Sequence, residues 1–370
     1  MNYNKYVYII KETHLFRVQI FSSGFDMEKY AILLKVDFDD FIGRLAKIQK
    51  LAAPVRRGEN SFKFGEVKTG GEIALYSIPT ILPPKKYFLP QNEILVEYDK
   101  RQKKWEATIY SEPLTVFGVH TCDLAGIQCL NMVFLDPMDA NYNIRKKKIL
   151  IIGLECNDYC DSYASCGLME TYMPDGGYDM FMTDLEDRFL IHISTPMGEE
   201  MAGKLKMLRQ ATDKDMEALA KLREKKKIIF KPEVDIGRGE LKSLFEHSFH
   251  NGVWNDIHER CLSCTNCTNV CPTCYCYDME DEEDLNRNNG RLVRKWDSCQ
   301  SRPFAMIAGG ENFRPERGGR QRHRYMRKFN YPVDKYNHYF CTGCGRCSRT
   351  CMAKIDLKET ISTLIETAKG

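Results

Sequence analysis

The stretch that decides the fold is Cys261-Leu-Ser-Cys264-Thr-Asn-Cys267-Thr-Asn-Val-Cys271-Pro272. The same spacing returns downstream in Cys341-Thr-Gly-Cys344-Gly-Arg-Cys347-Ser-Arg-Thr-Cys351. Both runs read C-x2-C-x2-C-x3-C, a spacing that binds four-iron, four-sulfide clusters. The first three thiolates of such a run hold three corners of a cube, and the fourth cysteine points away toward the other cluster. The two runs therefore predict two [4Fe-4S] clusters.

This pattern is that of the bacterial ferredoxins, in which the fourth cysteine of each run crosses to the other cluster. The predicted ligands of the first cluster are Cys261, Cys264, Cys267 and Cys351, and those of the second are Cys341, Cys344, Cys347 and Cys271. The alternative is a zinc-binding structural or nucleic-acid-binding protein. Zinc sites usually consist of separated C-x2-C pairs, often with histidine. Here three cysteines crowd into one short loop twice, which favours iron.

Composition supports a metal-binding role for these thiols. The chain has 370 residues with 16 cysteines, and 43% of its residues are hydrophobic, enough for two or three domains. The apolar run Tyr6 to Ile10 is too short for a secretory signal, and no stretch approaches the roughly 20 apolar residues that span a bilayer. We therefore expect a cytoplasmic protein, in which cysteines bind metal more often than they pair. A net charge of +3 gives no case for nucleic acid or membrane.

The chain divides into three predicted parts. Residues 1–26 differ in character from the rest of the chain and indicate an N-terminal extension, residues 27–254 a mixed α/β domain, and residues 255–370 a two-cluster, ferredoxin-like α+β domain. Within the α/β domain, short apolar runs predict buried strands at 114–119 and 149–154, with a helix over 124–134 between them. A strand–helix–strand unit favours parallel pairing, and sites lie beyond the carboxyl ends of such strands.

A third group of cysteines follows these strand ends. Cys122 comes after the first strand and Cys156 after the second, with Cys160 and Cys166 close behind. Four thiolates could converge there on a third cluster. Buried free thiols are the other interpretation, since free cysteine packs as a small hydrophobe. The spacing C-x3-C-x5-C matches no ferredoxin run, so the residues alone leave both possibilities open.

Residues 199–228 predict a long polar helical region. Its charged run, Arg223 to Lys227, is typical of a helix face exposed to solvent.

The chain resembles two related families: the beta subunits of sulfhydrogenases, which are soluble NAD(P)-linked nickel–iron hydrogenases, and the A-type subunits of anaerobic sulfite reductases. The resemblance covers most of the chain from about residue 30 onward. The stretches that carry it are Val119-His-Thr-Cys122-Asp-Leu, Gly153-Leu-Glu-Cys156, Cys160, Cys166-Gly-Leu-Met-Glu-Thr, Asp175-Gly-Gly-Tyr-Asp-Met, Cys261 to Tyr277, Arg294-Lys-Trp296-Asp-Ser-Cys299, Gly309-Gly-Glu-Asn-Phe313-Arg314 and Cys341 to Cys351.

The resemblance implies an anaerobic electron-transfer protein with a third [4Fe-4S] cluster on Cys122, Cys156, Cys160 and Cys166. Its implied partners are a flavin- and NAD(P)-binding diaphorase and a catalytic subunit, either a hydrogenase or a sulfite or sulfur reductase. The chain departs from the family in lacking a compact C-x-C near Cys160 and in having Met352 where proline usually follows the last cysteine. It has no G-x-G-x-x-G turn and no P-loop, so we expect no substrate chemistry on this chain.

Four cysteines and one basic segment remain. Cys129 is expected to pack in the core, while Cys274 and Cys276 either donate hydrogen bonds near the second cluster or form a redox-active pair with Cys299. The basic residues between the runs are Arg314, Arg317, Arg320, Arg322, Arg324, Arg327 and Lys328. They favour stabilisation of a negatively charged cluster, or docking of an acidic partner, over nucleic-acid binding.

Overall fold

The computed structural model describes residues 27–369, so the predicted extension at residues 1–26 lies outside the described part. The strands are β1 Tyr30–Leu34, β2 Lys50–Gly58, β3 Ser61–Glu66, β4 Asn92–Asp99, β5 Lys104–Ala107, β6 Leu114–His120, β7 Ile149–Leu154, β8 Met180–Asp184, β9 Arg188–Ile193, β10 Arg209–Gln210, β11 Tyr277–Glu283 and β12 Asn289–Trp296. The α-helices are α1 Phe38–Ile48, α2 Lys85–Phe88, α3 Thr121–Phe134, α4 Ala140–Lys148, α5 Cys166–Met169, α6 Pro196–Leu205, α7 Asp213–Ile229, α8 Leu241–His247, α9 Val253–Arg260, α10 Asn266–Asn269, α11 Arg317–Phe329, α12 Tyr331–Tyr336, α13 Arg346–Arg349 and α14 Leu357–Lys369.

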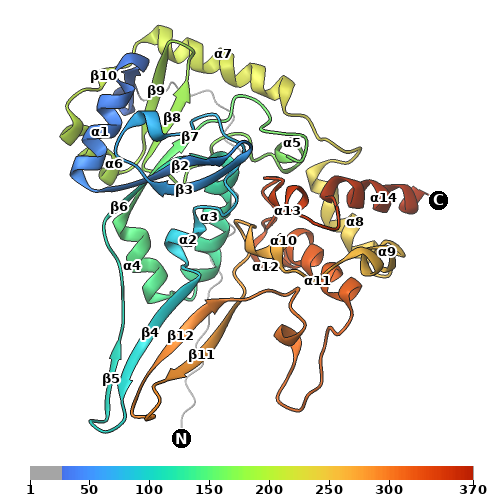
Figure 1. Cartoon of the computed structure of the whole chain (residues 1–370). Coiled ribbons are helices and arrows are strands. Elements are labelled where there is room, and N and C mark those ends of the chain that lie inside the picture. The colour runs from blue at the N-terminus through green and yellow to red at the C-terminus, as the bar shows by residue number, and fades with distance from the viewer. Residues whose placement is uncertain (1–26, 370) are drawn as a thin grey trace, which may run out of the picture.

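An eight-stranded sheet with the order β10-β1-β9-β8-β7-β6-β2-β3 forms the upper body of the molecule (Figure 1). Side chains of a strand alternate between the two faces of a sheet. Leu150 and Ile152 of β7 accordingly join the core beneath α1 and α6, whereas Ile149 and Ile151 join the core beneath α3 and α4. The central strands β6, β7 and β8 pair in parallel, so the predicted strand–helix–strand unit is confirmed, with α4 as an additional helix.

The predicted helical region over 199–228 is interrupted. Helix α6 ends at Leu205, because Lys206 takes a left-handed conformation with φ 53°. The chain then adds the short edge strand β10 beside β1 before Thr212 starts α7 with a capping box to Asp215. Composition alone did not indicate this break, because the two helices share the same polar character.

The cysteine runs lie in a mostly helical region beside the sheet (Figure 1). Its core is formed by apolar side chains of α8, α9, α11 and α14, among them Phe245, Trp254, Tyr325 and Phe329. The mixed α/β body followed by this region confirms the predicted fold class. The boundary drawn at residue 254 stays a prediction.

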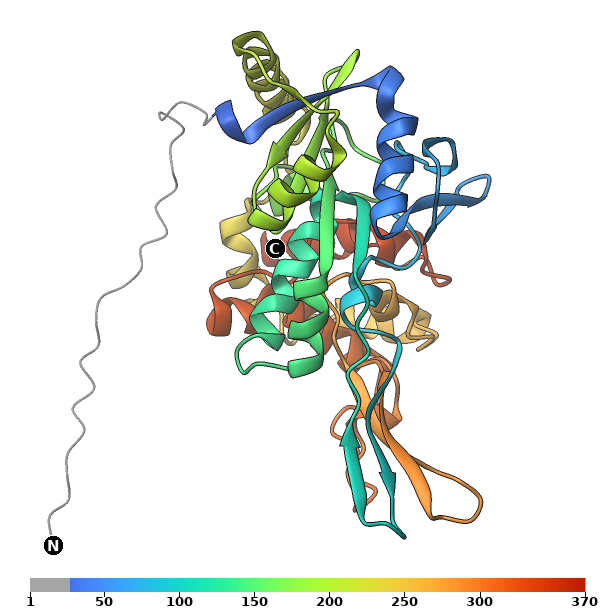
Figure 2. The ribbon, with the colours of Figure 1, turned by 90° about the vertical axis from the view of Figure 1, so that its left-hand side faces the viewer.

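A second sheet, with the order β11-β12-β4-β5, extends away from the body as an arm (Figures 1 and 2). Strands β4 and β5 precede the first cysteine run, whereas β11 and β12 lie between the two runs. Strand β12 pairs antiparallel with β4 from Asn289 opposite Asp99 to Lys295 opposite Asn92. The arm therefore joins the two predicted domains through backbone pairing.

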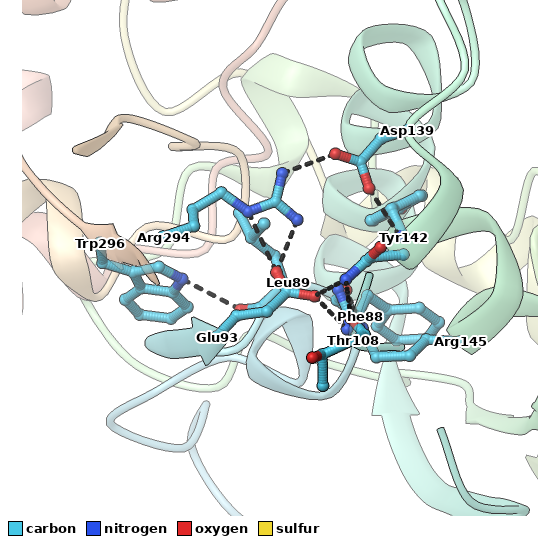
Figure 3. A network of polar contacts seen from close by, with 10 residues as sticks. Phe88, Leu89, Glu93, Thr108, Asp139, Tyr142, Arg145, Arg294 and Trp296 are labelled. Atoms are coloured by element: carbon cyan, nitrogen blue, oxygen red, sulfur yellow. Dashed lines mark hydrogen bonds and ion pairs between the residues drawn. The ribbon is translucent and has the colours of Figure 1, made fainter. Parts of the chain in front are cut away.

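A buried ion network fixes the base of the arm (Figure 3). The Arg294 guanidinium of β12 donates to Glu93 Oε2 of β4 at 2.6 Å and to Asp139 Oδ2 at 2.6 Å. Arg145 of α4 contacts the other oxygen of Glu93 and donates through Nε to the Phe88 carbonyl at 2.9 Å. Because the Arg294 and Glu93 side chains are only 4% and 5% exposed, each charge depends on its partner for stability.

We predict that Arg294→Met lowers the free energy of unfolding by about 3–5 kcal/mol, because it leaves buried carboxylates short of a counter-charge. Lys295→Met is the matched control, since Lys295 is the next residue of β12 and pairs with Glu280 and Glu282 at the surface. It should change the stability little. Urea unfolding followed by circular dichroism under anaerobic conditions measures both variants. Equal losses would contradict the role assigned to this network.

Within residues 27–369, no helix is both long enough and apolar enough to cross a membrane.

Candidate iron–sulfur centres

The two cysteine runs fold into loops with matching backbones. Ser263 and Thr265 of the first run have φ 53° and 63°, and Gly343 and Gly345 of the second run have φ 64° and 69°. Each pair flanks the second cysteine of its run, and each loop continues into a short helix, α10 or α13. Positive φ is uncommon for serine and threonine and indicates a conformation imposed by function. The repeated spacing therefore produces a repeated loop geometry.

Glycine is required in the second loop for a steric reason. A Cβ atom at Gly343 would lie 2.3 Å from the Ser165 carbonyl oxygen, and one at Gly345 would lie 2.7 Å from the backbone of Tyr163. The Ser165 amide also donates to the Gly343 carbonyl at 2.7 Å. The second run is thus pressed directly against the loop that carries Cys160 and Cys166.

Each run encloses a cavity together with the last cysteine of the other run. The first cavity is lined by Cys261, Cys264, Cys267, Cys347 and Cys351, and the second by Cys271, Cys341, Cys344 and Cys347. These sets contain the ligands predicted for the two clusters, with Cys351 beside the first run and Cys271 beside the second. The ligand assignment stays a prediction. The two cavities adjoin, because Cys347, Arg324, Tyr325 and Leu357 line both.

The chemistry of the cavity walls fits iron–sulfur clusters. The sulfur of Cys261 receives the Gln321 side-chain amide at 3.3 Å and the Ser263 amide at 3.4 Å, and that of Cys351 receives the Ile355 amide at 3.3 Å. N–H donors to cysteine sulfur stabilise the negative charge of a cluster and help to set its potential. Within residues 27–369, no three His, Cys, Asp or Glu side chains converge on a point suited to one metal ion. A cubane iron–sulfur cluster instead needs thiols spread around a cavity, and the cysteines of the two runs are spread in this way.

Positive charge from α11 lies against both cavities. Arg320, Arg324 and Lys328 recur every four residues and are buried, with exposures of 3%, 8% and 7%. Burial would lower the pKa of Arg324, but nearby sulfurs, those of Cys267 and Cys347 foremost, raise it well above its usual value. Lys328 responds in the same way to Cys271 and Cys274, with a pKa raised despite its burial. One face of α11 therefore carries the cations beside the predicted cluster sites. This favours the interpretation that the basic residues stabilise negatively charged clusters.

The third group of thiols lies where the strand ends predicted it. Cys122 is in the first turn of α3, after β6, and Cys156 follows β7. Burial raises the pKa of Cys122, Cys160 and Cys166, and the negative charge of Cys156 contributes to all three shifts. The Thr121 hydroxyl also contacts the Cys156 sulfur at 3.9 Å. Cys156 is therefore near each of the other three, while the ligand set stays a prediction.

A buried ion pair joins this group to the second run. Arg346, at the start of α13, donates two hydrogen bonds to the Asp123 carboxylate of α3, at 2.6 and 2.8 Å. Its Nε also donates to the Thr80 carbonyl at 2.6 Å. The pair ties the start of α3, which carries Cys122, to the second run, and the negative charge of Cys344 there adds to the effect of burial in raising the pKa of Cys122.

The charged run at 223–227 is only partly exposed, which corrects the solvated-face interpretation. Lys226 is 0% exposed and donates to Glu155 Oε1 at 2.7 Å and to the Tyr172 carbonyl at 2.8 Å. The Thr183 hydroxyl donates to the other Glu155 oxygen at 2.6 Å. This buried pair holds the chain directly before Cys156. Glu155 directly follows the buried strand β7, and a carboxylate in that position was the sequence signal that a buried cation would pair with it.

The remaining cysteines fall into two environments. Cys129 is fully buried in α3 and contacts the Tyr339 carbonyl at 3.8 Å, as core packing predicts. Cys274, Cys276 and Cys299, which lie outside the predicted ligand sets, line one further cavity. All sixteen cysteines belong to the described residues, and each is a free thiol.

Comparison with known proteins agrees with this geometry. The family of 4Fe-4S dicluster domains matches residues 260–355. Sulfhydrogenase 2 subunit beta of Pyrococcus furiosus is 33% identical over 345 residues, which are 92% of this chain and 99% of that protein. No solved structure matches the chain.

We predict that Cys122→Ser lowers the iron content from about 12 to about eight per chain, because loss of one ligand removes the predicted third four-iron cluster. Cys129→Ser is the control, since Cys129 lies in the same helix and is equally buried. It should retain all of its iron. Metal analysis after anaerobic purification measures both variants. A full iron complement in Cys122→Ser would remove Cys122 from the ligand set.

We predict that Arg324→Met lowers the reduction potentials of the clusters in the two adjoining cavities. A unit charge about 6 Å away at an effective dielectric constant of about 20 contributes on the order of 100 mV. The potential falls because the reduced cluster carries more negative charge than the oxidised one.

Arg322→Met is the control for this variant, because Arg322 lies over the Phe249 ring, 4.0 Å from its centre, and lines neither cavity. Redox titration followed by electron paramagnetic resonance measures both. Unchanged potentials in Arg324→Met would show that its charge is fully screened.

Proposed function

Because the chain belongs to the family of sulfhydrogenase beta subunits, we propose that it is the iron–sulfur electron-transfer subunit of a multi-subunit oxidoreductase. The observation that carries the proposal is the adjacency of its thiol groups. Two cavities lined by the predicted ligands share Cys347, and the loop of the third group packs on the second run through Ser165 and Gly343. Three clusters so placed form a continuous electron path.

The residues of this chain supply position and charge rather than bond chemistry. Cysteine thiolates hold the clusters, and Arg324 and Lys328 offset their negative charge. When bound, [4Fe-4S] clusters accept and release one electron each. Electron transfer needs nothing further from the protein except close spacing between the sites.

One end of the proposed path reaches the surface. Cys264 is the one exposed cysteine among the sixteen. Two apolar side chains next to the first cavity are also exposed, Leu262 by 62% and Met352 by 76%. Exposed apolar residues around a redox site are suited to docking another protein of the complex. We propose that electrons enter or leave the chain here, with the third cluster at the opposite end.

The proposed partners rest on the family. The name of the Pyrococcus relative indicates a beta subunit of a hydrogenase. We therefore propose that the catalytic partner is a hydrogenase subunit, and that a flavin- and NAD(P)-binding diaphorase lies at the other end of the path. Both are expected in the cytoplasm of an anaerobic cell, where exposed clusters such as the first survive.

We predict about 12 iron and about 12 sulfide per chain after anaerobic purification, from three cubane clusters. Dithionite should reduce them, and viologens should reoxidise them in one-electron steps, as monitored by visible absorbance and electron paramagnetic resonance. Copurification of the native complex then identifies the partners. Zinc in place of iron would overturn the proposal, and about eight iron would retain the function while removing the third cluster.

A further inference from the structure

A pair of thiols outside the predicted ligand sets lies at the base of the arm. The β11–β12 ladder ends with Tyr277 opposite Trp296, and the Asp297 amide then donates to the Cys276 carbonyl at 2.9 Å. This pairing brings Cys276 and Cys299 together as the two chains leave the sheet. Both residues line one cavity, and the Gln300 side-chain amide reaches the Cys299 sulfur at 3.4 Å.

The pair faces a cavity of about 310 Å³. Its charged wall is formed by Arg324, Arg327 and Lys328, and its remaining lining includes Cys274 and His323. Cys276 is half-buried, so one sulfur of the pair is reachable, whereas Cys299 is 6% exposed. An open, positively charged cavity over one reachable thiol and one buried thiol is the setting in which thiol–disulfide exchange takes place.

The same cavity adjoins the second cluster site. Arg324 and Lys328 line both cavities. Cys274 lines the thiol cavity and lies three residues after Cys271, a predicted ligand of the second cluster, and interaction between the two lowers the pKa of Cys271. The Lys328 ammonium donates to Thr273 at 2.6 Å, which fixes the segment between Cys271 and Cys274. The thiol cavity and the second cluster site therefore share the walls formed by Arg324 and Lys328.

We infer that Cys276 and Cys299 form a reversible dithiol/disulfide couple that exchanges electrons with the second cluster site. Closing the disulfide joins the two sulfurs and releases two protons and two electrons. The protons leave through the cavity, and the electrons pass one at a time to the clusters, whose presence rests on the proposed function. The reverse reaction takes up two electrons and two protons and restores both thiols.

The chemistry of the pair agrees with this role. Interaction with Cys299 lowers the pKa of Cys276, and the charge of Arg327 acts in the same direction. Cys276 is then the attacking thiolate and Cys299 the second, buried thiol. The ladder and the Asp297 bond hold the two cysteines on the wall of one cavity, where a disulfide with an S–S length of about 2.05 Å can close. In the described structure, both remain free.

The experiment poises the purified holoprotein in anaerobic mixtures of reduced and oxidised dithiothreitol, then alkylates the free thiols and measures the intact mass and the iron content. The expected result is a loss of two alkylated thiols at the oxidising end with no loss of iron. Peptide mapping should find Cys276 linked to Cys299. Cys276→Ser and Cys299→Ser should each abolish the loss of two thiols while keeping full iron, and Cys129→Ser should behave as the natural chain does.

Three outcomes would overturn the inference: no linkage in any mixture in which the iron is retained, a linkage between other cysteines, or loss of iron in Cys276→Ser. The last would make Cys276 a ligand instead. If Cys299→Ser does not fold, peptide mapping of the natural chain still decides. Failure of the proposed function appears separately, as a natural chain without iron, because thiol exchange with dithiothreitol requires no cluster.

Discussion

The arrangement of the thiol groups depends on one buried ion pair, that between Asp123 and Arg346. Both partners are almost completely buried, at 3% and 1% exposure, and Arg346 is held by the Thr80 carbonyl as well. Removing two charges from water is costly, so such a pair is retained when its geometry has a use. Here it fixes the start of α3, which carries Cys122, against the start of α13, which carries Cys347. The α/β body and the cysteine runs therefore cannot shift relative to one another without breaking it.

A second constraint is charge balance around the cysteines. Eight thiolates in two adjoining cavities repel one another, and each cluster with four thiolates keeps a net negative charge. Helix α11 meets this demand because its cations recur every four residues and so occupy one face. Lys85 adds to them at the Cys274 carbonyl, 2.8 Å away, and its burial lowers its pKa to about 8. The near-neutral total charge of the chain conceals this local concentration of cations.

The sequence predicted the features that depend on neighbouring residues, and it left open the contacts between segments that are distant along the chain. Spacing within each run predicted the cavities, because a C-x2-C-x2-C loop is short enough for its own residues to set its shape. The ends of β6 and β7 located Cys122 and Cys156, because carboxyl ends of neighbouring parallel strands share one edge. The pairing of β4 with β12 was not predictable, since about two hundred residues separate them and neither strand alternates strongly. Lys226 was misjudged because its neighbours are solvated, while its partner Glu155 is distant in sequence.

The closeness of Cys276 and Cys299 to the second cavity matters because the two kinds of centre carry different numbers of electrons. A [4Fe-4S] cluster exchanges one electron, whereas a dithiol exchanges two. The proposed diaphorase partner would deliver electrons in pairs, whereas each cluster accepts one electron at a time. The dithiol lies beside the middle of the proposed path, reached through Cys274 and bordered by the same Arg324 and Lys328 as the cluster site. It stores a pair of electrons without a change in the protein fold. The arm holds that dithiol together, because the β11–β12 ladder and the Arg294 network fix the two segments from which its cysteines emerge.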